Sequence, residues 1–160
     1  MSSKAALVNE KHYQAKLILA LLAEQDTNAL SYAAQVKAVE SSAVLLMHSA
    51  FMLFLAELAE SCQIKQSCLS VESLAQALAE EGRSHAVVET LLVLQAQQKS
   101  WLHELLSAQQ KVSLGLAVNE VNKTTHALQF SDISEEIDVN ALLQQFTSFV
   151  QQQRSFLSEW

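Results

Sequence analysis

The scarcity of glycine and proline is the feature that most limits how this chain can fold. The 160 residues include two glycines and no proline. Hairpins between strands, and tight connections between strands and helices, usually need glycine, Asn-Gly or proline. A sheet-rich fold is therefore unfavourable, and we predict helices joined by a few polar connections.

The composition supports a folded core. Half of the residues are hydrophobic and the formal net charge is −7, which excludes a disordered chain. The low glycine, proline and cysteine contents exclude collagen-like and disulfide-scaffold proteins. We expect a single domain over residues 1–160, which buries roughly 70% of the surface of its unfolded chain.

Two long helices are predicted in the first part of the chain. Hydrophobic residues recur there every three or four positions, as amphipathic helices require. The first helix should span residues 3–24, with Tyr13, Leu17 and Leu21 as its core-facing stripe. The second should span residues 29–61, and it is apolar on two sides in its second half.

Capping residues divide the remainder of the chain. Ser70, Ser84 and Asp138 are suited to helix N-termini, and Gly82 to a left-handed helix end. Ser100 either caps a new helix or interrupts a longer one. The predicted helical regions that follow these residues span 71–81, 84–110 and 139–158.

The helical pattern fades between residues 112 and 133, where β-branched residues are frequent and Gly115 permits a turn. We expect a long loop there, with one extended piece over residues 127–130. The predicted fold is all-α, an up-and-down bundle of four principal helices with one or two short additional helices.

Charge and hydropathy narrow the function classes. The chain has only two arginines, Arg83 and Arg154, and an isoelectric point near 5.1, so it lacks the basic surface that nucleic acids require. No secretory signal is visible, and the apolar run 43–56 is shorter than the ~20 residues of a membrane-spanning helix. We predict a cytoplasmic protein that binds neither nucleic acid nor membrane.

Catalytic and metal-binding motifs are not visible in the sequence. The five histidines form no pair three or four residues apart, and Cys62 and Cys68 lack the spacing of zinc ligands. Glu-x-x-His, phosphate-binding glycine loops and nucleophile elbows do not occur. We therefore predict no metal, no cofactor and no enzymatic activity.

Polar and aromatic residues beside the apolar stripes are the candidate site residues. Glu57 falls close to the stripe of the second helix, so its carboxylate must be paired, protonated or at the open end of the core. We predict a pair with Arg154, or otherwise with Lys16. Trp101 and Trp160 are either a ligand-stacking pair or core anchors.

A second apolar face on the long helix indicates a further contact. This face carries Val44, Phe51, Met52 and Leu55. A helix that is apolar all round must be covered on more than one side. Either it is the central helix of the domain, or this face meets a second subunit. We predict the second arrangement, a homodimer.

Four segments together resemble a known family. They are Tyr13 to Leu19, Glu40 to Glu57, Ser100 to Leu106, and the ending Arg154-x-x-Leu-Ser-Glu-Trp160. On these segments the chain resembles a family of small helical proteins of gamma-proteobacteria, classed as a domain of unknown function. The resemblance implies a bacterial, cytoplasmic helical protein and brings no activity or site with it.

The chain is also similar, more weakly, to the HEPN helical domains in length and in its opening pair of long helices. Nuclease members of that family carry Arg followed four to six residues later by His. Here His85 follows Arg83 by only two residues, and no histidine follows Arg154. The resemblance therefore implies no ribonuclease activity.

Three functions remain open. The first is a non-enzymatic interaction or scaffold protein with an unidentified protein partner, which we favour because apolar residues exceed the need of one core. The second is a small-ligand binder with a pocket near Trp101, Glu57 and Trp160. The third is a HEPN-like RNA-associated protein without the nuclease motif.

Overall fold

The computed structural model describes residues 3–116, 118 and 137–158, and every regular element in these ranges is helical. The all-α prediction is therefore confirmed. The elements are α1 (Lys4–Ala20), the 3-10 helix η1 (Leu21–Glu24), α2 (Tyr32–Ser61), α3 (Val71–Glu80), α4 (Ala86–Ala96), α5 (Trp101–Ser113) and α6 (Val139–Ser158).

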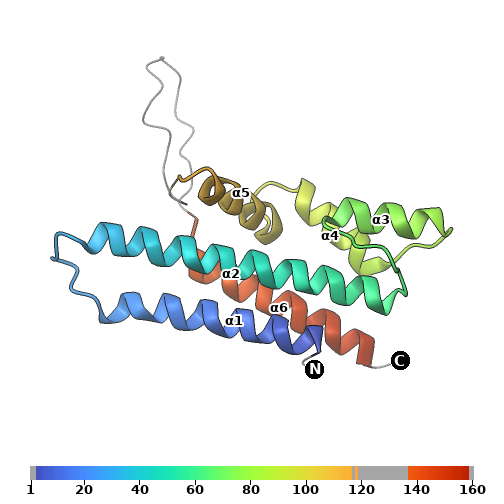
Figure 1. The fold of residues 1–160 in the computed structure, drawn as a ribbon, viewed down its shortest axis with the longest axis horizontal. Helices are drawn as coiled ribbons and strands as arrows, with labels where there is room; N and C mark the ends of the chain where they lie inside the picture. Colours follow the sequence, from blue (N-terminus) through green and yellow to red (C-terminus); the bar gives the residue numbers. More distant parts are fainter. Residues whose placement is uncertain (1–2, 117, 119–136, 159–160) are drawn as a thin grey trace, which may run out of the picture.

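The long helices lie side by side (Figure 1). Helices α1 and α2 form an antiparallel pair, and α6 packs against α1, α2 and α5. The short helices α3 and α4 pack on each other near the C-terminal end of α2, and α4 also contacts α5. The longest helix, α2, thus touches α1, α3, α5 and α6.

Most predicted helix ends are confirmed. The Ser70 hydroxyl accepts a hydrogen bond from the Ser73 amide at 3.1 Å, and the Ser73 hydroxyl accepts one from the Ser70 amide at 3.0 Å. Ser100 accepts from the amide of His103 at 3.1 Å. Asp138 caps α6, and Gly82 has a left-handed φ of +67°.

The region 84–110 contains two helices. Lys99, between α4 and α5, has a φ of +65°, which a right-handed helix does not accommodate. Ser84 does not cap α4, because His85 occupies the N-cap position and makes no side-chain cap. Helix α5 continues to Ser113, so the predicted loop begins too early; its residues 117 and 119–133, including 127–130, lie outside the described residues.

Three of the four residues of the predicted dimer face belong to the core. Val44, Phe51 and Leu55 are at most 2% exposed, and Met52 is half-buried. Phe51 makes edge contacts with Trp101 of α5 and with Phe146 of α6, both at 6.2 Å between ring centroids. Except for Met52 at its edge, the second apolar face of α2 is therefore covered within the chain, and α2 is a central helix.

Helix α1 turns the opposite way from the prediction. Its predicted core-facing residues Tyr13, Leu17 and Leu21 are 62%, 49% and 49% exposed. Apart from one leucine, the face that packs inward is made of residues that are smaller or polar. These buried residues are Val8, His12, Ala15 and Leu19.

Candidate functional site

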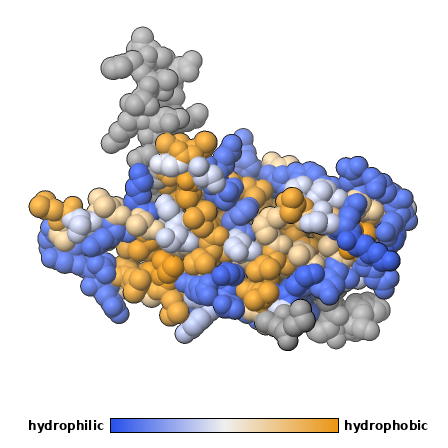
Figure 2. Space-filling view, in the orientation of Figure 1, coloured by the Kyte–Doolittle hydropathy of each residue, from blue (hydrophilic) through white to orange (hydrophobic). Residues whose placement is uncertain are grey.

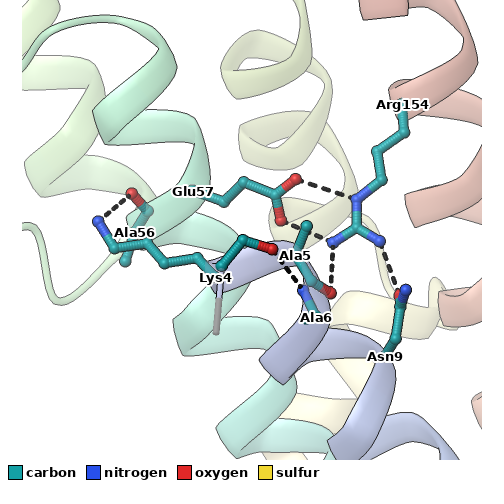
Figure 3. Close-up of polar contacts among 8 residues, drawn as sticks. Lys4, Ala5, Ala6, Asn9, Ala56, Glu57 and Arg154 are labelled. Carbon is teal, nitrogen blue, oxygen red and sulfur yellow. Dashed lines mark hydrogen bonds and ion pairs between the residues drawn. The ribbon is translucent and has the colours of Figure 1, made fainter. Parts of the chain in front are cut away.

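A cluster of polar contacts joins three helices at the N-terminal end of α1 (Figure 3). The Arg154 guanidinium of α6 donates through Nε to Oε1 of Glu57 at 3.0 Å and through Nη2 to Oε2 at 2.7 Å. Its Nη1 donates to Oδ1 of Asn9 at 2.7 Å, and Nη2 also reaches the carbonyl of Ala5 at 3.4 Å. We call these four residues the clamp.

The clamp is a structural device rather than a reactive one. Each of the three guanidinium nitrogens of Arg154 donates to a protein oxygen, and both carboxylate oxygens of Glu57 accept. The two side chains are each 23% exposed, and such bidentate pairs are stronger and more specific than single contacts. The clamp therefore fixes α6 on the α1–α2 pair.

A second ion pair lies beside the clamp. The Lys4 ammonium lies 2.9 Å from Oε2 of Glu60 and donates to the carbonyl of Ala56 at 3.3 Å. These contacts tie the start of α1 to the end of α2. They also border a hollow of about 630 Å³, whose other walls come mainly from residues 63–68.

His12 is the buried polar residue of α1. It is 8% exposed, and its ring meets the Phe146 ring edge-on at 4.4 Å between centroids. Its Nε2 has no hydrogen-bond partner among the described residues. Burial, and secondarily the positive charge of Arg154, lower the pKa of His12 from 6.5 to about 4. The imidazole is therefore neutral at pH 7.

An open groove of about 660 Å³ runs between α1 and α6, above His12. Its described α6 lining residues are all uncharged, and Lys16 of α1 is the one charged residue among the described residues of its lining. The residues that line it are Asn9, His12, Tyr13 and Lys16 of α1, and Asn140, Leu143, Gln144, Thr147, Ser148 and Gln151 of α6.

The structure brings together two of the five predicted site residues, Glu57 and Arg154. Lys16 is exposed and lines the α1–α6 groove instead of meeting Glu57. Trp101 is 6% exposed and stacks on Phe146 at 4.9 Å with an interplanar angle of 13°, as a core anchor does. Trp160 lies outside the described residues.

Sequence reasoning missed His12 and Asn9. A signal existed for His12, because it repeats with Val8, Ala15 and Leu19 at spacings of four, three and four, which is the periodicity of one helix face. Asn9 gave no signal, since a lone asparagine in a helix usually faces water. Its role depends on Arg154, which lies 145 residues further along the chain.

Residues 3–116, 118 and 137–158 contain no group of three or more His, Cys, Asp or Glu side chains that could hold a metal ion. In the same ranges one helix, α2, is long and apolar enough to cross a membrane, and half of its most apolar window is buried inside the protein. The core helix of a folded domain has the same properties.

Comparison with known proteins places the chain in a family. The model of the family of unknown function DUF6586 matches residues 1–160. The chain belongs to this family. No curated protein and no solved structure matches it.

Proposed function

We propose that this protein is a non-enzymatic interaction or scaffold protein of the cytoplasm. In this proposal α1, α2, α5 and α6 form an up-and-down bundle, and α3 and α4 are the short additional helices. The bundle is a rigid support, and one of its helices presents a binding surface to a partner protein.

The observation that carries the proposal is the exposed row of Tyr13, Leu17 and Leu21, which we call the α1 stripe. Isolated exposed hydrophobic residues are normal on a protein surface. These three, however, follow one another at every fourth position, so they form a continuous row along one helix face. Rows of this spacing are how one helix contacts another.

The charges around the α1 stripe favour a particular partner. Glu10 and Glu24 lie seven residues before and after Leu17, on the same side of the helix. A second α1 packed antiparallel about Leu17 would place Glu10 opposite Glu24, with like charges together. The complementary partner is an amphipathic helix whose apolar row ends in basic residues, opposite Glu10 and Glu24, and which places uncharged or acidic residues beside Lys16.

The groove beside the α1 stripe extends this surface. Tyr13 belongs to both, and the amides and hydroxyls of α6 form the opposite wall. A helix lying along α1 can place apolar side chains against the α1 stripe and polar ones against these hydrogen-bonding groups. Uncharged polar walls set orientation without a large desolvation penalty.

Site-specific photo-crosslinking tests the proposal. A photoreactive residue replaces Leu17 in native-lysate capture, and the matched control replaces Val93, an equally apolar exposed residue on α4. We expect position 17 alone to capture one protein, through an amphipathic segment whose apolar row ends in basic residues. A synthetic peptide of that segment should bind wild type at least about tenfold more tightly than Leu17→Glu. Equal capture at both positions, or an acidic segment, contradicts the proposal.

A small-ligand role is the second candidate, and His12 favours it. Its neutral ring, whose Nε2 has no hydrogen-bond partner among the described residues, lies in the lining of a 660 Å³ groove, a size that suits a small ligand. Native mass spectrometry of the freshly purified protein tests it. A bound metabolite that is lost in His12→Phe, but kept in Val93→Glu, supports this role, and an unliganded protein contradicts it.

The RNA-associated alternative receives no such support. Arg83 donates to the carbonyl of Cys62 at 2.8 Å and pairs with Glu81 at 2.9 Å. Arg154 is engaged in the clamp. Both arginines thus bind protein oxygens where a phosphate would otherwise bind.

A further inference from the structure

The side of helix α2 opposite its fully buried residues is only partly covered by the other described helices. This face carries six residues at successive spacings of four, three, four, three and four, the spacing of a coiled-coil seam. We call it the outer seam: Ala38, Ser42, Leu45, Ser49, Met52 and Ala56. The first three are exposed and the last three are half-buried.

All of the outer seam except Ala38 lies in a stretch without formal charge. Residues 41–56 include no Asp, Glu, Lys or Arg. Figure 2 shows the same property on the surface, where apolar and weakly polar atoms run along the middle of the molecule over α2. From Ala38 to Ala56 this strip is about 27 Å long, at 1.5 Å per residue.

The order of large and small residues in the outer seam is symmetric about residue 47. If a second α2 lies antiparallel with residue 47 opposite residue 47, Leu45 falls opposite Ser49 of the second copy. Met52 likewise falls opposite Ser42, and Ala38 opposite Ala56. Every large side chain then meets a small one, so the two helices can approach closely and interdigitate.

A parallel pairing does not have this property. It would set Leu45 against Leu45 and Ser49 against Ser49, so that wide layers alternate with narrow ones and the helices cannot approach evenly. The antiparallel arrangement also places opposite ends of the two helix dipoles together. The uncharged stretch 41–56 removes the like-charge contacts that oppose self-association of an acidic protein.

We propose that the outer seam binds the outer seam of a second copy of this chain, antiparallel and centred on residue 47. The contact is isologous, as in a two-fold symmetric dimer. It uses different residues from the α1 stripe, so it does not rest on the proposed partner. A dimer of this kind presents two α1 stripes and becomes a bivalent scaffold.

The mass in solution gives the first test. We expect light scattering after size exclusion to approach twice 17.6 kDa as the chain concentration rises from micromolar to near-millimolar. Leu45→Glu should weaken association about tenfold or more, whereas Val93→Glu on α4 should not change it. Both sites are exposed, and circular dichroism verifies that both variants fold. A wild type that stays monomeric overturns the proposal.

Cysteine crosslinking tests the direction and register. Ala38→Cys and Ala56→Cys chains are oxidised separately and then as a mixture. In the proposed register the two positions meet only across copies, so the mixture should give a mixed dimer. Each variant alone should not, because identical positions lie about 27 Å apart. Crosslinking within either single variant overturns the antiparallel register.

The two proposals fail separately. Leu17→Glu should abolish partner capture and leave the mass unchanged, whereas Leu45→Glu should lower the mass and leave capture at Leu17 in place. A partner that is lost in Leu45→Glu but kept in Leu17→Glu would show that the outer seam binds that partner, and would overturn self-association as its use.

Discussion

Helices α1 and α2 lie side by side, yet they distribute their apolar residues in opposite ways. Helix α2 places its large residues inward, and Phe51, Phe54 and Leu55 are at most 2% exposed. Helix α1 places Tyr13 and Leu17 outward and seats a histidine and an alanine against the core. Tyr13 and Leu17 therefore contribute less to the core of the folded chain than Val8 and Leu19 do.

The contrast shows that helical periodicity identifies the rows of side chains on a helix but not which row packs against the core. On α2 this choice hardly matters, because three sides of the helix are apolar and the other helices cover most of that surface. On α1 two rows compete, and the inner one is chosen by fit. Ala15 lets α1 approach its neighbours closely, and His12 presents its ring to the edge of Phe146.

The largest expected effect tests this contrast directly. Leu55→Ala on α2 should lower the free energy of unfolding by about 2–5 kcal/mol, because it leaves a cavity in the core. Leu17→Ala on α1 should change it by less than about 0.5 kcal/mol. Urea denaturation measures both. Comparable losses would mean that the α1 stripe is buried in solution.

The second prediction compares the histidines of the two helices. The unfolded His12 takes up a proton near pH 6.5, and the folded one only near pH 4. The stability that depends on neutral His12 is therefore complete above pH 6.5 and is lost as the pH falls toward 4. At about 1.4 kcal/mol per unit, the total loss approaches roughly 3 kcal/mol.

A matched variant isolates the contribution of His12 to the pH dependence of stability. His12→Phe keeps a ring against Phe146 and removes the titration. The stability of this variant relative to wild type should therefore rise as the pH falls from 7 to 4. The pKa of His48 on α2 is also lowered by burial, and both proteins keep that contribution. Denaturation curves at several pH values provide the measurement. Parallel pH profiles for the two proteins would contradict the burial of neutral His12.

The third prediction concerns the clamp that holds α6 on both helices. Arg154→Met or Glu57→Gln should each lower the free energy of unfolding by about 1–3 kcal/mol, because the remaining partner loses a hydrogen-bonded counterpart. The double variant should lose less than the sum by about 1 kcal/mol. Thermal denaturation of all four proteins gives the cycle, and additive losses would mean that the pair is not coupled.

The smallest expected effect concerns the N-caps of α1 and α2. The Ser3 hydroxyl accepts a hydrogen bond from the amide of Ala6 at 3.2 Å, whereas Ser31 makes no side-chain cap on α2. Ser3→Ala should therefore lower the free energy of unfolding by about 1 kcal/mol, and Ser31→Ala by only a few tenths. Urea denaturation of both variants decides it. Equal losses would show that the cap of α1 contributes nothing of its own.

The features predicted correctly from the sequence are mostly local ones. The caps Ser70, Ser100 and Asp138 act on residues two or three positions away, so their chemistry is readable in a short segment. The Glu57–Arg154 contact was also predictable, because a carboxylate beside an apolar stripe requires a counterion. The contact of Arg154 with Asn9 of α1 was not predictable, since nothing in the sequence links Asn9 to α6.

The errors arise where several neighbours compete for one segment. The pattern in the second half of α2 fits a dimer face and a central helix equally well, and only the packing of α5 and α6 decides between them. The Ser84 cap fails by one residue, because α4 starts after His85. Such differences depend on tertiary fit, which a hydropathy pattern does not contain.

The clamp has a consequence for how the chain is made. Arg154 and Glu57 are 97 residues apart, and ribosomes add roughly 5–20 residues per second. For about 5–20 s during synthesis, therefore, the α1–α2 pair has emerged without α6, the helix that packs against it. Through that interval the side of Phe51 that meets Phe146 is open to water and to chaperones, so the nascent chain is most vulnerable to aggregation before α6 emerges.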